Sequence, residues 1–251
     1  MPSRRSSAPI PQRLFGKIAL VTGGTQGIGL AIARALLAEG CKVIITGRKQ
    51  AGLDRACKEL ANKKVSPSTV MPMLCDIRDP RSVQALFAGV KRRFHRLDIL
   101  VNNAGIGQVG KNIAELPLES WTEVIETNLT GTFLVTQAAL PVMRRGATIV
   151  NNLSVAARKI FPGSAAYNAS KHGALGFTDT LREELRSEGI RVIALLPGAT
   201  DTDIWKAVWP DAPRKKMMSP EAVAIAVVNA LATPENATVE ELTIRPSVGT
   251  L

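Results

Sequence analysis

Short apolar runs alternate with longer helical patterns from Ile18 to the end of the chain, and this alternation restricts the possible folds most strongly. The runs are continuously apolar, which is typical of strands that helices cover on both faces. Because crossovers between parallel strands are right-handed, the pattern predicts an α/β fold, a doubly wound parallel sheet of about seven strands with helices on both faces. The predicted strands are residues 18–22, 42–46, 70–75, 99–102, 148–152, 191–196 and a last one near 241–245. The predicted helices begin near Ile28, Gln50, Pro80, Ser120, Ala165 and Pro220.

Two of these helices carry a clear start signal. Asp79 precedes Pro80, and Ser219 precedes Pro220. In each pair the first side chain can accept a hydrogen bond from an amide of the first turn, and proline suits the first helical position because an N–H there would be unpaired. We therefore expect N-caps at Asp79 and Ser219.

Length and composition limit the class of protein. With 251 residues, 45% hydrophobic, the chain can bury one substantial core, and we expect residues 14–251 to form a single domain. No apolar run reaches the roughly 18 residues of a membrane span, and no secretory signal is recognisable, which predicts a cytoplasmic protein. The three cysteines have no C-x-x-C spacing, so we expect them to be reduced, with Cys75 buried at a strand end. His95 and His172 lack a ligand at metal-binding spacing, so no metal site is predicted.

The formal net charge of +11 raises the question of a nucleic-acid partner. Arg4, Arg5, Arg13 and Lys17 stand in a segment without acids, and the remaining charge is scattered. No basic stripe with interleaved aromatics appears, so we expect neither a nucleic acid nor a membrane as partner. A polyanionic cofactor and a basic surface account for the charge. Residues 1–13, rich in Ser, Arg and Pro, are expected to be a disordered basic tail.

A glycine-rich turn, TGGTQGIG at residues 22–29, follows the first predicted strand and opens a helix. Gly23 would permit the tight turn, Gly27 would let backbone amides approach a pyrophosphate, and Gly29 would let helix and strand pack closely. The spacing differs from the common G-x-G-x-x-G, and a plain structural turn is the alternative. Its place between the first strand and the first helix favours phosphate binding. Thr25, Gln26 and Ile28 complete this predicted cofactor segment.

The end of the second predicted strand indicates which dinucleotide would bind. An NAD-specific site needs a carboxylate there for the ribose hydroxyl, but the residue is Gly47, followed by Arg48 and Lys49. These cations could simply begin a solvated helix. Because a guanidinium is suited to a 2′-phosphate, we expect Arg48 to bind it, and we expect NADP(H) in preference to NAD(H).

Tyr167, the only tyrosine, lies four residues before Lys171, so on a helix the two share one face. A cation beside a phenol favours its ionised form, and a drop of about two or three units from its usual pKa of ~10 would make Tyr167 an acid near neutrality. Such pairs also arise on solvated helices. Here the pair follows a nucleotide-binding turn, an asparagine and a serine in the order that a carbonyl reduction requires.

Taken in order, these motifs resemble the short-chain dehydrogenases/reductases from about residue 14 to 245. The family's T-G-x-x-x-G-x-G corresponds to residues 22–29, and its N-N-A-G corresponds to residues 102–105. Its helix asparagine, catalytic serine and Tyr-x-x-x-Lys correspond to Asn128, Ser154, Tyr167 and Lys171. Its Pro-Gly segment corresponds to Pro197 and Gly198, with Thr202 as the threonine that contacts the carboxamide. The stretch before the active-site turn, Asn151-Asn152-Leu153-Ser154, keeps one serine where the family often has two.

The resemblance implies a role for each matched residue. Tyr167 would be the acid, Ser154 would polarise the carbonyl, and Lys171 would lower the tyrosine pKa and hold the nicotinamide ribose. Asn128 would position a water that connects Lys171 to solvent. The implied cofactor contacts are Asp76 and Ile77 at the adenine, Asn103, Ala104 and Gly105 along the ribose, and Pro197, Gly198, Thr200 and Thr202 near the nicotinamide, with Tyr167 and Lys171.

The substrate pocket is expected to be mainly apolar, with two tryptophans on a mobile lid. Arg158 and Lys159 could anchor a carboxylate or could face solvent. The predicted lining residues are Ile106, Val155, Ala156, Ile160, Phe161, Trp205 and Trp209.

These features predict an oxidoreductase that transfers a hydride between NADP(H) and a small to medium, largely apolar carbonyl or secondary alcohol. A reductase like those acting on 3-oxoacyl-carrier proteins is one alternative, and a non-catalytic NADP(H)-sensing protein is another. Small residues along 165–187 would allow two helices to approach closely. Together with the resemblance, they predict a homodimer or homotetramer formed through this helix and the one near Ser120.

Overall fold

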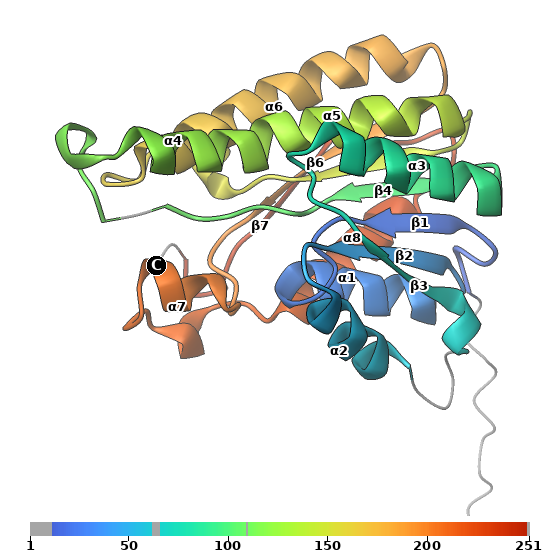
Figure 1. Ribbon diagram of the computed structural model, residues 1–251, viewed down its shortest axis with the longest axis horizontal. Coiled ribbons are helices and arrows are strands. Elements are labelled where there is room, and N and C mark those ends of the chain that lie inside the picture. The colour runs from blue at the N-terminus through green and yellow to red at the C-terminus, as the bar shows by residue number, and fades with distance from the viewer. Residues whose placement is uncertain (1–11, 62–65, 109, 250–251) are drawn as a thin grey trace, which may run out of the picture.

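The strands form one parallel sheet in the computed structural model, which describes residues 12–61, 66–108 and 110–249. The strand order is β3-β2-β1-β4-β5-β6-β7 (Figure 1), as a doubly wound fold requires. The seven strands are β1 (Ile18–Val21), β2 (Lys42–Gly47), β3 (Val70–Leu74), β4 (Ile99–Asn102), β5 (Thr148–Asn152), β6 (Arg191–Pro197) and β7 (Glu241–Ile244). The predicted fold class is confirmed, and the strand limits agree with prediction to within one residue.

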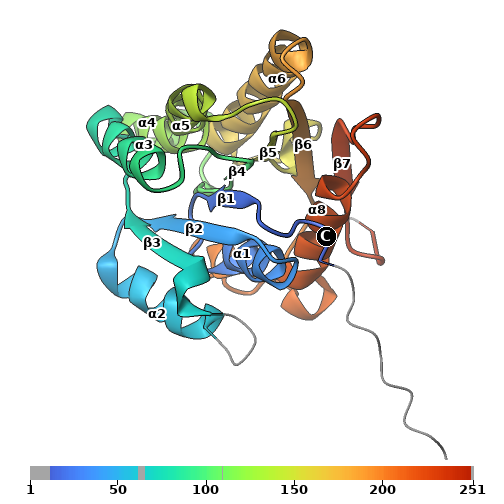
Figure 2. The same ribbon diagram turned by 90° about the vertical axis from the view of Figure 1, so that its right-hand side faces the viewer.

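Helices cover both faces of this sheet (Figures 1 and 2). One face carries α1 (Gly27–Ala38), α2 (Gln50–Leu60) and α8 (Pro220–Leu231). The other carries α3 (Pro80–Phe94), α4 (Leu118–Ile125), α5 (Gly131–Ala139) and α6 (Ala165–Arg186). The short α7 (Ile204–Val208), which the sequence pattern did not predict as a helix, lies beyond the sheet at the ends of the strands.

Both predicted N-caps are present. The Asp79 side chain accepts a hydrogen bond from the amide of Arg81 at 2.9 Å, and the Ser219 hydroxyl accepts one from the amide of Ala222 at 3.2 Å. The helices begin at the prolines that follow these residues. Side-chain capping therefore fixes where α3 and α8 start.

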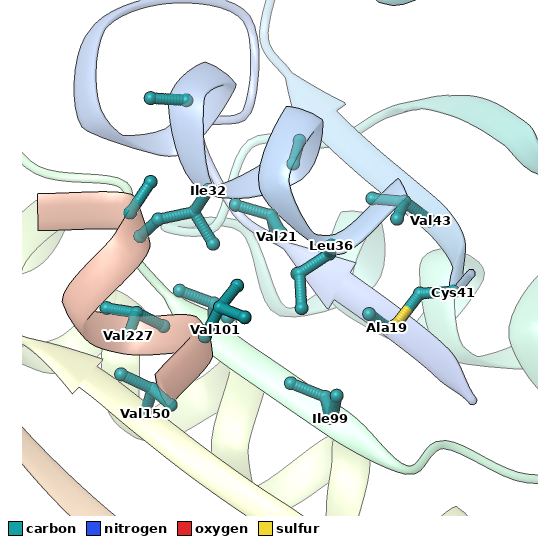
Figure 3. Close-up of a cluster of buried hydrophobic side chains, with 14 of the residues drawn as sticks. Ala19, Val21, Ile32, Leu36, Cys41, Val43, Ile99, Val101, Val150 and Val227 are labelled. Carbon is teal, nitrogen blue, oxygen red and sulfur yellow. The ribbon is translucent and has the colours of Figure 1, made fainter. Parts of the chain in front are cut away.

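The core has one layer on each side of the sheet because neighbouring strand residues point to opposite faces. Ala19 and Val21 of β1 face α1 and α8, whereas Ile18 and Leu20 face α3, α5 and α6. Figure 3 shows the first layer, in which Ile32 and Leu36 of α1 and Val227 of α8 pack on Val21, Val101 and Val150 of the central strands. This packing covers β1 and β4, which are hydrogen-bonded neighbours in the sheet.

The edge strands depart from the predicted two-sided burial. β3 and β7 alternate between partly buried and exposed residues, and Leu74 is 58% exposed. Each edge strand has a neighbour on one side only, so helices cover it incompletely.

The predicted tail is wrong at its inner end. Residues 1–11 lie outside the described residues, but Arg13 is placed by an ion pair with Glu39 at 2.6 Å and a hydrogen bond to Asn229 at 3.0 Å. Glu39 is the C-cap residue of α1 and lies far from Arg13 in the sequence. The local sequence therefore does not reveal this partner.

The cysteines have the predicted form. Cys41 and Cys75 are buried, Cys57 is partly buried, and all three are free thiols. Cys75 directly follows β3, as expected. Within the described residues, no group of three or more His, Cys, Asp or Glu is placed to hold a metal. None of the helices traced there is both long and apolar enough to cross a bilayer.

Candidate active site

A cavity of about 680 Å³ opens at the carboxyl ends of the strands, around the junction of β1 and β4. In a doubly wound sheet the strand order reverses at this junction, and ligands usually bind there. The cavity is lined by every residue predicted to contact the cofactor: Gly23, Thr25, Gln26, Gly27, Ile28, Gly29, Arg48, Asp76, Ile77, Asn103, Ala104, Gly105, Tyr167, Lys171, Pro197, Gly198, Thr200 and Thr202. Ser154 also lines it, whereas Asn128 does not.

The glycine-rich turn forms one wall of the cavity. Gly23 and Gly27 have φ values of +62° and +55°, which side chains disfavour. A Cβ on Gly29 would lie 2.5 Å from the carbonyl oxygen of Gly23 and 2.4 Å from the side-chain nitrogen of Asn103. The N-cap residue of α1, Gln26, makes no side-chain capping bond, so the first amides of the helix have no acceptor from it. This turn therefore has the close packing and the amides that an anion at a helix N-terminus needs.

Hydrogen bonds tie the turn to β4 and β5. The Thr22 hydroxyl accepts from the amides of Asn103 at 2.9 Å and Ala104 at 3.0 Å. The Asn103 side chain donates to the carbonyls of Thr22 and Gly23 and accepts from the Asn152 side chain at 2.8 Å. Three protein contacts therefore use its side-chain amide, and the contact of Asn103 with a ribose stays a prediction.

The far end of the cavity holds two arginines. Arg48, exposed after β2, lines the cavity as predicted. A Cβ on Gly47 would lie 2.7 Å from the Thr25 methyl group, so glycine suits this position better than a carboxylate residue. Asp76 is held by Arg78, whose guanidinium lies 2.7 Å from the carboxylate, and this hydrogen bonding lowers the pKa of Asp76. Arg78 lines the cavity as well, although the sequence pattern gave no signal for it.

Three buried oxygen atoms on the cavity wall lack a hydrogen-bond partner among the described residues. They are the hydroxyls of Thr46 and Thr127 and the side-chain oxygen of Asn152. Buried polar groups are almost always satisfied. A polar ligand with hydroxyl and phosphate groups, such as a dinucleotide, fits a wall with such unpaired oxygens.

Tyr167 and Lys171 lie on the same face of α6, as their spacing predicts. The ammonium of Lys171 is 5.6 Å from the centre of the Tyr167 ring and donates to the main-chain carbonyl of Asn152 at 3.1 Å. Burial lowers the pKa of Lys171 to about 8.

The expected acidification of Tyr167 does not appear. Burial raises the pKa of Tyr167, and the opposing influence is a hydrogen bond with Ser154, not the charge of Lys171. The physical reason is that the phenol and the amine are both desolvated, which disfavours the charged form of each.

Ser154 lies at the end of β5, at the N-cap of a short 3-10 turn, η5 (Val155–Ala157). Its hydroxyl oxygen accepts from the amide of Ala156 at 3.1 Å. That bond uses an acceptor site of the oxygen, so the hydroxyl proton stays available to donate. The geometry suits a residue that hydrogen-bonds a carbonyl oxygen beside Tyr167.

The side chain of Asn128 is used within the protein, and the expected role of this residue in positioning a water stays a prediction. Asn128 lies in a π-helical segment, η3 (Glu126–Thr130), between α4 and α5. Its side chain accepts from the Ile106 amide and donates to the Ile106 carbonyl, both at 2.9 Å, and donates to the Ser170 hydroxyl at 3.1 Å. Both amide hydrogens are used, so the side chain fixes the loop after β4 against α6.

The rest of the cavity agrees with the predicted apolar pocket except at one residue. Ile106, Val155, Ala156, Phe161, Trp205 and Trp209 line it, but Ile160 does not and is 63% exposed. The two indoles meet edge to face at 6.3 Å, and the Trp205 nitrogen donates to the carbonyl of Thr200 at 2.7 Å. This bond anchors α7 to the segment after β6.

Gln108 is a cavity residue that the sequence reasoning missed. Its side-chain oxygen accepts from the amide of Ala166 at 3.2 Å, and its nitrogen donates to the carbonyl of Gly163 at 3.0 Å. Ser164, the N-cap residue of α6, makes no side-chain cap. Gln108 therefore caps the helix that carries Tyr167, from a loop 58 residues away, where no local signal exists.

Comparison with known proteins identifies the family to which the chain belongs. Residues 17–213 match the family model described as short chain dehydrogenase. A putative ketoacyl reductase of Streptomyces coelicolor is 42% identical over 196 residues, which cover 76% of this chain and 74% of the relative. An uncharacterized oxidoreductase of Staphylococcus saprophyticus is 33% identical over 240 residues, 93% of this chain and 98% of the relative.

Two solved structures have the same fold at similar identity. An alcohol dehydrogenase from the archaeon Thermococcus sibiricus, complexed with 5-hydroxy-NADP, has a TM-score of 0.84 at 31% identity. A variant of actinorhodin polyketide ketoreductase with NADPH has a TM-score of 0.81 at 35% identity. Each similarity covers 93% of this chain and 97% of the other.

Proposed function

Because this chain belongs to the short-chain dehydrogenase family and is an oxidoreductase acting on CH–OH groups, we propose that it interconverts a carbonyl and a secondary alcohol with NADP(H). The substrate would be a small to medium, largely apolar ketone, aldehyde or hydroxy acid. One observation carries the proposal: Ser154, Tyr167 and Lys171 line the same cavity as the glycine-rich turn.

The cavity residues divide into parts that suit a dinucleotide. The amides at the start of α1 would hold the pyrophosphate, and Arg48 would hold the 2′-phosphate. The unpaired hydroxyls of Thr46 and Thr127 would hydrogen-bond the polar groups in between. NADP forms bound to two structurally similar enzymes favour the same cofactor here. When bound, the nicotinamide supplies the hydride.

The protein's own groups would manage the proton and the charge on oxygen. In reduction, negative charge builds on the carbonyl oxygen, and the hydroxyls of Ser154 and Tyr167 would both donate to it. The phenol proton of Tyr167 would then pass to that oxygen. Lys171, cationic below its pKa of about 8, would stabilise the phenolate that is left.

A substrate panel tests this function. Ketones, aldehydes and hydroxy acids would be screened with each of the two nicotinamide cofactors, following the absorbance of the reduced form. We expect turnover of at least one carbonyl class with NADPH, at a higher kcat/KM than with NADH. Absence of NADPH oxidation with every carbonyl would contradict the proposal.

A second candidate is reduction of 3-oxoacyl groups on a carrier protein. The ketoacyl reductase relative at 42% identity favours it. In this candidate the basic surface of the enzyme would dock an acidic carrier protein. Because salt screens charges, reduction of the carrier-bound 3-oxoacyl group would weaken as salt is added, whereas reduction of a free ketone would not. Equal salt responses of the two substrates would rule out this candidate.

We also propose that the protein is a homodimer or homotetramer that forms through α4 and α6. Trp121 of α4 and Phe133 of the adjoining α5 are 38% and 42% exposed, and Gly173 and Gly176 of α6 are exposed as well. Exposed large apolar groups and exposed small residues on these helices suit a close helix contact. Sedimentation at micromolar concentration tests this, and a stable monomer would refute it.

A further inference from the structure

The structure separates two neighbouring cations that the sequence leaves equivalent. Arg158 pairs with Glu241 of β7 at 2.8 Å and does not line the cavity. Lys159 lines the cavity, and no carboxylate of a described residue lies within ion-pair distance of it. Its ammonium instead lies 5.5 Å from the centre of the Phe161 ring, which also lines the cavity. Arg158 is thus neutralised, and Lys159 is held at the cavity with its charge unmatched.

The cavity offers this ammonium no acidic partner. Its lining includes two carboxylates among the described residues, Asp76 and Asp203. Asp76 pairs with Arg78 and Asp203 with Lys206, each at 2.7 Å. Arg245, after β7, adds a further lining cation that makes no ion pair with a described residue. The cavity therefore has unpaired cations and no unpaired carboxylate among its described lining residues, which favours an anionic group.

Lys159 belongs to the same turn as the residues expected to act on the carbonyl. Its amide donates to the carbonyl of Val155 at 2.9 Å, so its main chain stands one turn beyond Val155, the residue that follows Ser154. Lys159 and Ser154 line the same cavity, so an anion bound to the ammonium could belong to a molecule whose carbonyl Ser154 holds. The aromatic walls of Phe161, Trp205 and Trp209 suit the apolar remainder of such a molecule.

We propose that the substrate is a short oxo acid, or the corresponding hydroxy acid, whose carboxylate binds the ammonium of Lys159. This inference rests on the proposed function and narrows its substrate class. The carboxylate binds and orients only. The carbonyl carbon gains the hydride, its oxygen gains the Tyr167 proton, and the reduced nicotinamide is oxidised.

Matched substrates and variants test the proposal. The substrates are 2-oxobutanoate and 3-oxobutanoate with their methyl esters, each reduced with NADPH by the wild type, Lys159→Gln and Arg158→Gln. For at least one pair we expect the wild type to favour the acid about tenfold in kcat/KM. Lys159→Gln should abolish that preference by raising KM for the acid, with KM for the ester and NADPH unchanged. Arg158→Gln should keep it.

A binding measurement provides a readout that does not depend on turnover. Tryptophan fluorescence would be titrated with butyrate, and with butyramide as its neutral match, in the presence of saturating NADP⁺. We expect saturable quenching by butyrate in the wild type and Arg158→Gln, and at least tenfold weaker binding in Lys159→Gln. Quenching by butyramide should be the same in all three.

The outcomes separate this inference from the proposed function. Reduction of esters with no preference for acids, or an equal loss for both in Lys159→Gln, overturns the carboxylate site and leaves the reductase function standing. If no carbonyl compound oxidises NADPH, the proposed function fails together with the substrate assignment. The butyrate titration then decides separately whether Lys159 binds a carboxylate.

Discussion

The ammonium of Lys171 donates to the main-chain carbonyl of Asn152 at 3.1 Å and lies 5.6 Å from the ring centre of Tyr167. Lys171 is 6% exposed, and its side chain makes no ion pair among the described residues. A buried ammonium without a carboxylate is costly, so the fold is less stable with this charge than with an apolar side chain of similar size. The position is explained by chemistry at Tyr167 more readily than by stability.

Replacing Lys171 with methionine should therefore stabilise the fold while abolishing turnover. The folded pKa of about 8 lies below the unfolded value of ~10.4, so burial of the charge costs about 3 kcal/mol at pH 7. Losing the bond to Asn152 offsets part of that, and we expect a net gain of about 2 kcal/mol. Between pH 8 and 10 the folded wild type binds fewer protons than its unfolded state, so the wild type becomes more stable as pH rises. The stability gained by Lys171→Met should therefore shrink across that window. Urea unfolding of both proteins at several pH values measures it, and a constant difference would contradict the assignment.

The rate of carbonyl reduction should fall as pH rises through about 8. Lys171 is cationic below that value and neutral above it, whereas burial raises the pKa of Tyr167 and keeps its phenol protonated. Single-turnover reduction by NADPH should be flat near pH 6.5 and decline about tenfold per pH unit above 8. Lys171→Arg serves as the control, because a guanidinium stays charged and should remove this decline from whatever activity remains. A wild-type rate that rises with pH would be incompatible with these roles.

Gly29→Ala should damage both stability and cofactor binding. The new Cβ would lie 2.5 Å from the Gly23 carbonyl oxygen, a backbone atom that cannot move without distorting the turn. We expect a loss of about 2 kcal/mol in the free energy of unfolding and at least tenfold weaker NADPH binding. Gly52→Ala is the matched control, because its Cβ would meet nothing closer than 3.9 Å. Calorimetric titration with NADPH would distinguish the two, and equal affinities would show that the turn does not hold the cofactor.

Arg48→Ala should change cofactor preference rather than activity in general. The guanidinium lines the cavity, and a 2′-phosphate is its expected partner. KM for NADPH should rise at least tenfold and KM for NADH less than twofold. Lys49, which does not line the cavity, provides the control, and Lys49→Ala should alter both values by less than twofold. A similar rise for both cofactors in Arg48→Ala would mean that the phosphate binds elsewhere.

The fold was predictable because its signals are local. Apolar runs marked the buried strands, and Asp79 and Ser219 marked two helix starts to the residue. The errors concern tertiary partners. Arg13 is fixed by Glu39 at the end of α1, and the exposure of Leu74 depends on the position of β3 at the sheet edge.

The candidate site was predictable in its membership and less so in its contacts. The order of the motifs predicted that Ser154, Tyr167 and Lys171 share one site, and all three line the cavity. Hydrogen bonds from distant loops decide which polar groups remain available in it. Asn128 binds Ile106 rather than facing the cavity, and Gln108 caps α6 across a long sequence separation. The pKa of Tyr167 was expected to fall and instead rises, because burial cannot be read from the spacing of two residues.

Tyr167→Phe provides the most direct test of the central claim, which is that the phenol delivers the proton in carbonyl reduction. The variant removes one hydroxyl and keeps the ring that packs beside Lys171. NADPH oxidation with the best carbonyl substrate would be measured together with NADPH affinity by titration. We predict a kcat lower by at least about a thousandfold, with the affinity for NADPH within threefold of the wild type. Undiminished kcat at unchanged affinity would contradict the claim and would mean that another group donates the proton.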